Sequence, residues 1–300
     1  MLVDRGELDP YAPVARYWPE FKAGGKEQVT VAHLMSHSSG LSGWQEPMAP
    51  EDLYDWDLSC ARLAAQEPWW EPGTASGYHA ITQGYLVGEV IRRIDGRSVG
   101  QFFAQEVAGP LGADFFIGLP ASEDDRVARV IPPPPLADLV AGADPTSLPI
   151  RTFSNPPLSA EQSWDTAWRR AEIPAAGGQG NARSVARVQS VLAHGGEIDG
   201  VRLLSEAGCL RALERQIDGM DLVLGVPLRF GLGYGLPSPE APLSPNEHAC
   251  YWGGWGGSLV VVDMDAHLCL AYVMNRMGEG TMGDTRAIEI LFAAYGALEA

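Results

Sequence analysis

The sequence predicts an α+β fold in which one antiparallel sheet is flanked by helices. Helical patterns dominate the middle of the chain, whereas strand patterns come mainly after residue 198. Near the end, 258–262 and 268–273 are two apolar runs separated by a short turn, which is typical of a hairpin within a sheet. A helical segment, 284–298, then closes the chain. Helices followed by strands, without regular alternation, favour α+β over a parallel α/β architecture.

The length and the order of the segments indicate a single domain. A chain of 300 residues can build one domain with a substantial core. We expect one domain over 1–300, with a mainly helical part at 50–195 and a sheet part with a closing helix at 198–300.

The helices follow from the spacing of apolar residues and from the residues at the helix ends. The clearest pattern is 78–94, in which apolar residues recur at helical spacing before Asp95–Gly96 ends the segment. Thr30, Asp57 and Ser98 are suitable N-cap residues for other segments. The other predicted helices are 31–37, 51–66, 98–107, 184–193, 205–215 and 284–298.

The strands are marked by apolar runs and by glycine-containing turns. Asp199–Gly200 lies between apolar residues and predicts a two-residue hairpin. The stretch 229–236 reads RFGLGYGL, which predicts a strand punctuated by glycine, and 115–119 predicts a short strand. The proline-rich stretch 131–157 predicts a long surface excursion near the functional site.

The composition argues against several classes of function. A formal net charge of −17 disfavours nucleic acids and anionic membrane surfaces as partners, because both need a positive footprint. No window has the apolar length of a membrane span. The first ten residues, MLVDRGELDP, lack the features of a signal peptide, so we expect a cytoplasmic protein. The cysteines show no C-x-x-C spacing and indicate reduced, mostly buried thiols.

Three stretches stand out as possible sites of chemistry. They read VAHLMSHSSGL (31–41), EPGTASGYHA (71–80) and WGGWGGS (252–258). Paired glycines at the head of a strand often mark close approach of another group to the backbone, so 252–258 is a candidate wall of a substrate cleft. A glycine-rich loop that simply enters a strand is the alternative.

Taken together, these stretches resemble the serine β-lactamase and penicillin-binding-protein superfamily, most closely the family VIII carboxylesterases. The resemblance covers nearly the whole chain and includes LVDRGELD near the start, GPLG, FGLGYG and YVMNRM. It implies a β-lactamase/transpeptidase-like fold and transfer of an acyl group to a serine and then to water, with backbone N–H groups holding the oxyanion. It also implies a small-molecule ester or acyl substrate and no cofactor.

The resemblance assigns roles to particular residues. Tyr78 stands where the family places a tyrosine that relays a proton between nucleophile and leaving group. Trp252, Gly253 and Gly254 stand at the third motif and, with His79, form the predicted substrate-binding set. Trp255 would then supply a backbone N–H to the oxyanion hole. Ordinary packing of these aromatic side chains in the core is the alternative.

Two departures from the β-lactamase pattern favour neutral substrates. Ala80 replaces the asparagine whose amide grips a β-lactam side chain, and Trp252 replaces a lysine that would pair with the lactam carboxylate. Both replacements make the site more apolar, so we expect neutral esters or other acyl compounds as substrates.

A third departure concerns the nucleophile, because the chain contains no S-x-x-K. Its only lysines are Lys22 and Lys26, and Pro19 and Ala23 stand three residues before them. The resemblance places the S-x-x-K helix just before the segment that corresponds to 1–9. We therefore expect the nucleophile and the first strands to lie upstream, and we expect little or no turnover by these 300 residues.

Other readings of the same residues remain open. His33 and His37 share a helix face, but HLMSH lacks the glutamate of HExxH and no third ligand is evident, so no metal site is predicted. No G-x-S-x-G motif marks another nucleophile, although Ser36, Ser38, Ser39, Ser76 and Ser258 are candidates. The alternatives to hydrolysis are a non-catalytic protein that binds acyl compounds and an acyltransferase on the same fold.

Overall fold

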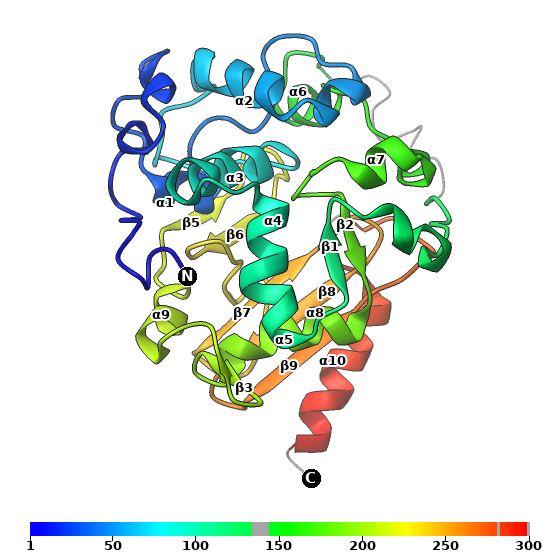
Figure 1. The fold of residues 1–300 in the computed structure, drawn as a ribbon. Helices are drawn as coiled ribbons and strands as arrows, with labels where there is room; N and C mark the ends of the chain where they lie inside the picture. Colours follow the sequence, from blue (N-terminus) through cyan, green and yellow to red (C-terminus); the bar gives the residue numbers. More distant parts are fainter. Residues whose placement is uncertain (134–143, 281–282, 299–300) are drawn as a thin grey trace.

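The computed structural model describes residues 1–133, 144–280 and 283–298, so part of the predicted excursion at 131–157 lies outside it. The described residues form an α+β architecture, as predicted (Figure 1). The α-helices are α1 (Val31–Met35), α2 (Trp56–Ala65), α3 (Thr82–Asp95), α4 (Val99–Phe103), α5 (Gly109–Leu111), α6 (Leu148–Phe153), α7 (Thr166–Arg170), α8 (Ala182–Ala193), α9 (Glu206–Arg211) and α10 (Thr285–Leu298). The strands are β1 (Phe115–Ile117), β2 (Gly178–Gly180), β3 (Glu197–Ile198), β4 (Val201–Arg202), β5 (Ile217–Met220), β6 (Pro227–Phe230), β7 (Ala249–Gly253), β8 (Leu259–Asp263) and β9 (Leu268–Tyr272).

The late strands form an antiparallel sheet. Strand β8 pairs with both β7 and β9, and β5 pairs with β6. Gly235 bridges both Phe230 and Tyr251, so the β5–β6 hairpin continues into the β7–β8–β9 meander. The predicted hairpins at 199–200 and at the end of the chain are both confirmed.

The sheet lies between two helices. Because side chains alternate between the faces of a strand, neighbouring residues of β7 and β8 pack in different layers. Cys250 and Val262 pack against the end of α8, whereas Tyr251 and Val261 pack against α10. The last strands are therefore covered on both faces.

A second core lies in the helical region, above the sheet in Figure 1. Helices α1, α2 and α3 meet around large buried aromatic side chains, including Trp18, Phe21, Trp44 and Tyr85. The Tyr85 hydroxyl donates to the Leu53 carbonyl (2.5 Å), which satisfies its polar end inside this core. The core holds the segments that precede α1 and α3, and these segments carry the candidate site.

The helices predicted at 51–66 and from 78 begin or divide differently in the structure. The predicted helix at 51–66 is a 3₁₀ helix followed by α2, because the Asp55 carboxylate accepts from the Leu58 N–H (3.0 Å) and caps α2 in place of Asp57. The helix predicted from 78 begins only at Thr82. The residues before Thr82 are extended and bonded to distant segments, as described below.

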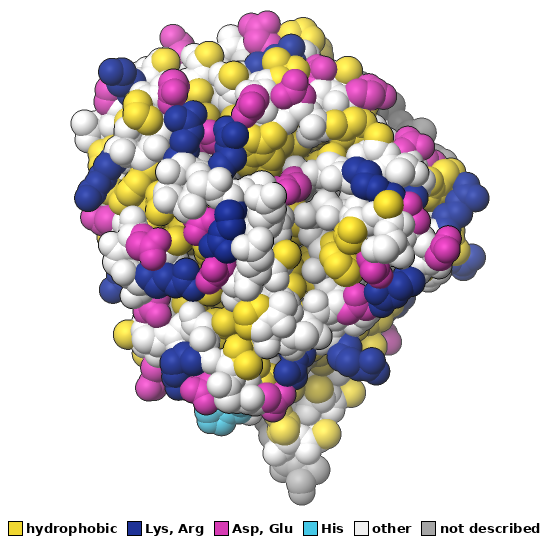
Figure 2. Space-filling view, viewed as in Figure 1, with side chains coloured by type: hydrophobic (Ala, Val, Ile, Leu, Met, Phe, Trp, Pro, Cys, Tyr) yellow, Lys and Arg dark blue, Asp and Glu magenta, His cyan; other side chains and the backbone are white. Residues whose placement is uncertain are grey.

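None of the helices within the described residues has both the length and the apolar character needed to cross a bilayer. On the face shown in Figure 2, basic and acidic side chains are interspersed rather than gathered by sign. Many of them form ion pairs, such as Arg126 with Asp114 and Arg97 with Glu106.

Candidate active site

The loop that carries Tyr78 is held by the turn between β5 and β6. The backbone N–H of Tyr78 donates to the Asp221 carboxylate (3.1 Å), and the N–H of Leu222 donates to the Ser76 carbonyl (2.8 Å). Asp221 is fully buried, and the same oxygen accepts two further backbone N–H groups in its own turn. Tyr78 is therefore positioned by a carboxylate from a distant part of the chain.

Four aromatic rings come together beside this loop. The His37 ring centroid lies 5.2 Å from that of Tyr78, 5.0 Å from Phe230 and 5.3 Å from Trp252. The His37 and Trp252 rings are nearly parallel, with 8° between their planes. The centroids of Tyr78 and Trp252 are 6.0 Å apart. The structure thus brings together two predicted site residues that are far apart in the sequence.

Two buried histidines link the segments behind this cluster. The backbone N–H of His79 donates to Nδ1 of His37 (3.0 Å). The His79 ring donates from Nδ1 to the Gly77 carbonyl (2.5 Å), so its Nε2 is free to accept from the Ser39 hydroxyl (2.7 Å). Burial lowers the pKa of His79 to about 4 and lowers that of His37 well below 6.5, so both rings are neutral at pH 7.

The hydrogen bonds of the His79 ring are relevant to its predicted role in substrate binding. His79 is buried, and both ring nitrogens are occupied by partners within the protein. Through these two hydrogen bonds the His79 ring connects the loop at Ser39 to the loop at Gly77. Substrate contact by His79 stays a prediction.

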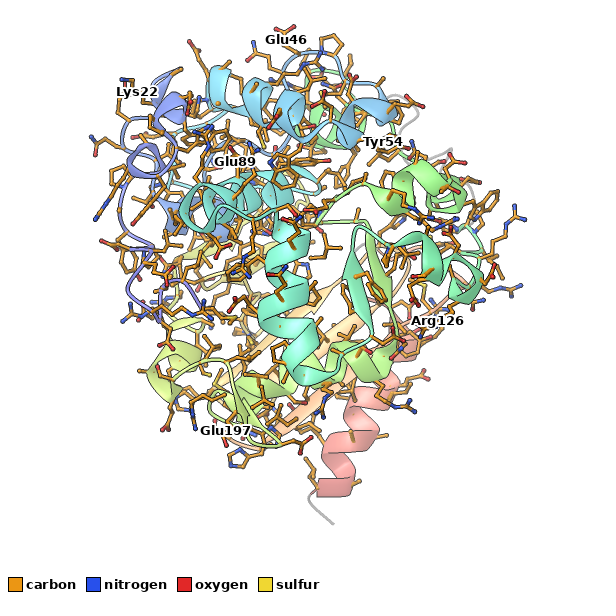
Figure 3. All side chains as sticks on the ribbon, viewed as in Figure 1. Lys22, Glu46, Tyr54, Glu89, Arg126 and Glu197 are labelled. Atoms are coloured by element: carbon orange, nitrogen blue, oxygen red, sulfur yellow. The ribbon has the colours of Figure 1, made fainter. Side chains whose placement is uncertain are left out.

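The Tyr78 hydroxyl is a hydrogen-bond donor rather than a base at neutral pH. Burial, together with the negative charge of Asp221, raises the pKa of Tyr78 to about 12. A nearby cation would lower this pKa, but neither lysine is beside the tyrosine. Lys22 is exposed at the outer edge of the molecule (Figure 3), and Lys26 is buried at the end of α2, where it donates to the Ala64 carbonyl (3.0 Å).

The glycine-rich segment forms a tight turn between β7 and β8. Trp252 and Gly253 end β7, and the N–H of Gly254 donates to the Ser258 carbonyl (2.9 Å). Trp255 lies in the turn with 39% of its surface exposed. Within the described residues its backbone N–H has no hydrogen-bond partner. That N–H is therefore available as a donor, and its role in an oxyanion hole stays a prediction.

The turn is braced by the residues at the start of α10, which the sequence did not indicate. Arg286 donates to the Gly256 carbonyl (2.9 Å) and pairs with Asp284. Gly256 and Gly257 have φ values of +92° and +116°, and a side chain at Gly257 would collide with the Asp284 carboxylate. A hollow of about 850 Å³ lies beside the turn, lined by 131–133, 276–280 and 283–286.

His33 and His37 do not form a joint site. Helix α1 ends at Met35 instead of continuing to His37, and the His37 backbone adopts a left-handed conformation with φ of +58°. His33 instead caps α1, because its Nδ1 accepts from the Thr30 N–H (3.3 Å). Among the described residues, no group of three or more His, Cys, Asp or Glu side chains is arranged to hold a metal ion.

The comparisons with known proteins agree with this architecture. The model of the β-lactamase family matches residues 1–295. The chain belongs to the β-lactamase family. The structure is similar to the crystal structure of a family VIII carboxylesterase, with a TM-score of 0.90 and 45% identity over 98% of this chain and 78% of that chain. It is also similar to a penicillin-binding-protein homologue from Caulobacter crescentus, with a TM-score of 0.88 and 39% identity over 99% of this chain and 78% of that chain.

A curated relative of this β-lactamase family member is the esterase/β-lactamase LipL of Mycobacterium tuberculosis. The two are 37% identical over an alignment of 292 positions, which covers 92% of this chain and 65% of LipL. The chain therefore spans about two thirds of the length of that relative. The resemblance to family VIII carboxylesterases and the β-lactamase/transpeptidase-like fold are both confirmed.

Sequence reasoning predicted Tyr78 and Trp252, which the structure brings together, but missed the residues that hold them. His37 was expected to share a helix face with His33, and nothing in its motif placed its ring against both Tyr78 and Trp252. Asp221 stands between Met220 and an apolar run, in no recognisable motif, and its link to Tyr78 spans 143 residues of sequence. The left-handed backbone of His37 and the burial of the Asp221 carboxylate can be recognised only in the folded chain.

Proposed function

We propose that this β-lactamase family member binds small neutral esters or related acyl compounds beside Tyr78 and Trp252, as a carboxylesterase-type site. The observation that carries the proposal is the aromatic cluster in which Tyr78 and Trp252 lie 6.0 Å apart around a neutral histidine. Neither lysine of the chain lies there, so no lysine ammonium is available to pair with the carboxylate of a β-lactam. An apolar site with few polar groups suits a neutral acyl compound.

The complete reaction of such a site is ester hydrolysis through an acyl-serine. A serine oxygen attacks the ester carbonyl, the alcohol leaves with a proton, and water then cleaves the acyl-serine to release the acid and regenerate the serine. Tyr78 carries the proton that a leaving alkoxide requires. The free N–H of Trp255 is the donor for the negative oxygen of the tetrahedral intermediate.

These 300 residues contain no S-x-x-K, so we propose that on their own they bind acyl compounds without turning them over. The protonated state of Tyr78 supports this proposal. A tyrosine with a pKa of about 12 cannot take a proton from a serine at neutral pH unless a cation lowers that pKa.

The test combines ester binding with ester hydrolysis. Binding of phenyl butyrate is measured by tryptophan fluorescence and by saturation-transfer NMR, and hydrolysis is followed with p-nitrophenyl butyrate. We expect saturable binding that Trp252→Ala weakens about tenfold, or about 1.4 kcal/mol. Tyr11→Phe, at an exposed tyrosine, is the control and should bind normally.

Each half of the proposal can fail separately. A folded protein that does not bind the ester, or that binds it equally well after Trp252→Ala, would contradict the location of the site. Release of more than one equivalent of p-nitrophenol, abolished by Tyr78→Phe, would contradict the absence of turnover.

A further inference from the structure

His37 combines three features that are unusual for a core side chain. Its backbone has a φ of +58°, a conformation that L-residues adopt infrequently. Its side chain is 1% exposed. Its Nε2 has no hydrogen-bond partner within the described residues.

The tautomer of His37 follows from the one hydrogen bond that its ring makes with the described residues. Nδ1 accepts from the backbone N–H of His79 (3.0 Å), so the neutral ring carries its proton on Nε2. That N–H is a buried donor surrounded by aromatic rings. A buried donor without a partner is unfavourable, and most native proteins avoid it.

Filling space does not account for this histidine. A phenylalanine would occupy a similar volume without burying an N–H, and an asparagine would adopt the left-handed backbone more readily while still offering an acceptor to His79. Only a flat ring that also carries an acceptor provides both contacts seen here. Unfavourable local conformations that persist tend to occur at functional sites.

The ring and the acceptor of His37 each contact a different side of the proposed ester site. The ring stacks on Trp252 with 8° between the planes, and its centroid lies 5.2 Å from that of Tyr78. The acceptor holds His79, the residue that follows Tyr78 in the chain. His37 thus contacts both Trp252 on β7 and the Tyr78–His79 segment that precedes α3.

We propose that His37 is a positioning residue whose ring sets the separation between Tyr78 and Trp252. The inference deepens the proposed function, because it assigns the spacing of the same site to a residue that does not itself react. The ring packs beside the partly buried ring of Tyr78, and the bond from His79 fixes the turn that leads into α3. Among the described residues, the titratable groups in contact with Tyr78 are His37, through its ring, and Asp221, through the Tyr78 backbone N–H.

Two variants separate the two contacts. His37→Asn keeps an acceptor for the His79 N–H and tolerates the backbone conformation, but it removes the ring. His37→Phe keeps a ring against Trp252 but removes the acceptor. Both variants should unfold at a lower urea concentration than the wild type, so loss of stability alone cannot distinguish them.

The distinguishing readout is nitration of Tyr78 by tetranitromethane at about pH 8, followed by peptide mass spectrometry. Nitration requires the ionised and accessible phenol, and each drop of one in pKa raises the ionised fraction about tenfold. We expect His37→Asn to raise the nitration rate of Tyr78 at least about tenfold, and His37→Phe to change it less than about twofold. The exposed Tyr11 provides the reference within each sample.

An unchanged rate in His37→Asn would overturn the inference, and so would an equal increase in both variants. If His37→Phe does not fold, Trp252→Leu tests the same contact from the other side, and it should also raise the nitration of Tyr78 about tenfold. Unchanged nitration in that variant would overturn the inference as well. The readout needs no substrate, so its outcome is independent of whether the chain binds or hydrolyses esters.

Discussion

The Asp221 carboxylate provides the sharpest test of how the candidate site is held. One of its oxygens accepts three backbone N–H groups, from Tyr78 (3.1 Å), Val223 (3.0 Å) and Leu224 (2.9 Å). The residue is 0% exposed. Asp221→Ala therefore removes the shared acceptor of the Tyr78 loop and of the turn between β5 and β6.

The magnitude follows from the groups left without a partner. A buried polar group that loses its partner costs about 1–3 kcal/mol, and hydrogen bonds to a charged group lie toward the upper end of that range. Three such bonds, of which one is fully buried, give an expected loss of about 3–5 kcal/mol in the free energy of unfolding. Asp221→Asn keeps an acceptor oxygen and should lose less than about half of that.

Urea unfolding followed by circular dichroism measures these differences. Asp125→Ala is the control, because Asp125 is exposed and its side chain has no hydrogen bond to other described residues, and it should change stability by less than about 0.5 kcal/mol. A loss below about 1 kcal/mol in Asp221→Ala, or equal losses in the alanine and asparagine variants, would refute the reasoning.

Two further predictions concern stability. Because burial lowers the pKa of His79 from 6.5 to about 4, the unfolded chain binds a proton in this window that the folded chain does not. The free energy of unfolding should therefore fall as the pH is lowered from about 6.5 to about 4, with about 2 kcal/mol lost to His79 at pH 5. When the free energy of unfolding is measured by urea titration and plotted against pH, His79→Gln should show a shallower slope than the wild type. An equal slope would exclude His79 as the cause. Gly257→Ala should lose about 2 kcal/mol because its φ is +116° and a Cβ would collide with Asp284, whereas Gly296→Ala, with nothing within 4 Å, should gain up to about 1 kcal/mol. Equal thermal shifts for the two glycine variants would contradict the described turn.

The sequence alone predicted those parts of the fold whose signals are local. The hairpin at 199–200 and the last two strands depend on turn residues and apolar runs, and both were found. Strand β5 was missed because its residues, Ile217 to Met220, include a charged residue and a glycine and show no alternating pattern. It forms because its backbone pairs with β6, a non-local contact.

In the candidate site, too, local motifs could be predicted from the sequence and non-local contacts could not. Tyr78 and Trp252 were predicted as site residues because they stand in motifs whose order resembles a known family. The start of α3 was predicted too early because His79 and Tyr78 bond to His37 and Asp221, which no local pattern reveals. His37 was expected to share a helix face with His33, but α1 ends at Met35 and the left-handed backbone turns the ring elsewhere.

The measurement that tests the central claim most directly is labelling with a fluorophosphonate, read by peptide mass spectrometry. The purified 300-residue chain is treated under native conditions beside a serine hydrolase known to react, and its folding is checked by circular dichroism. The account predicts a folded protein in which no serine carries the phosphonate, because no serine here has a lysine three residues after it. A single stoichiometric adduct at a serine of this chain would contradict the account and would identify a nucleophile that neither the motifs nor the aromatic cluster indicated.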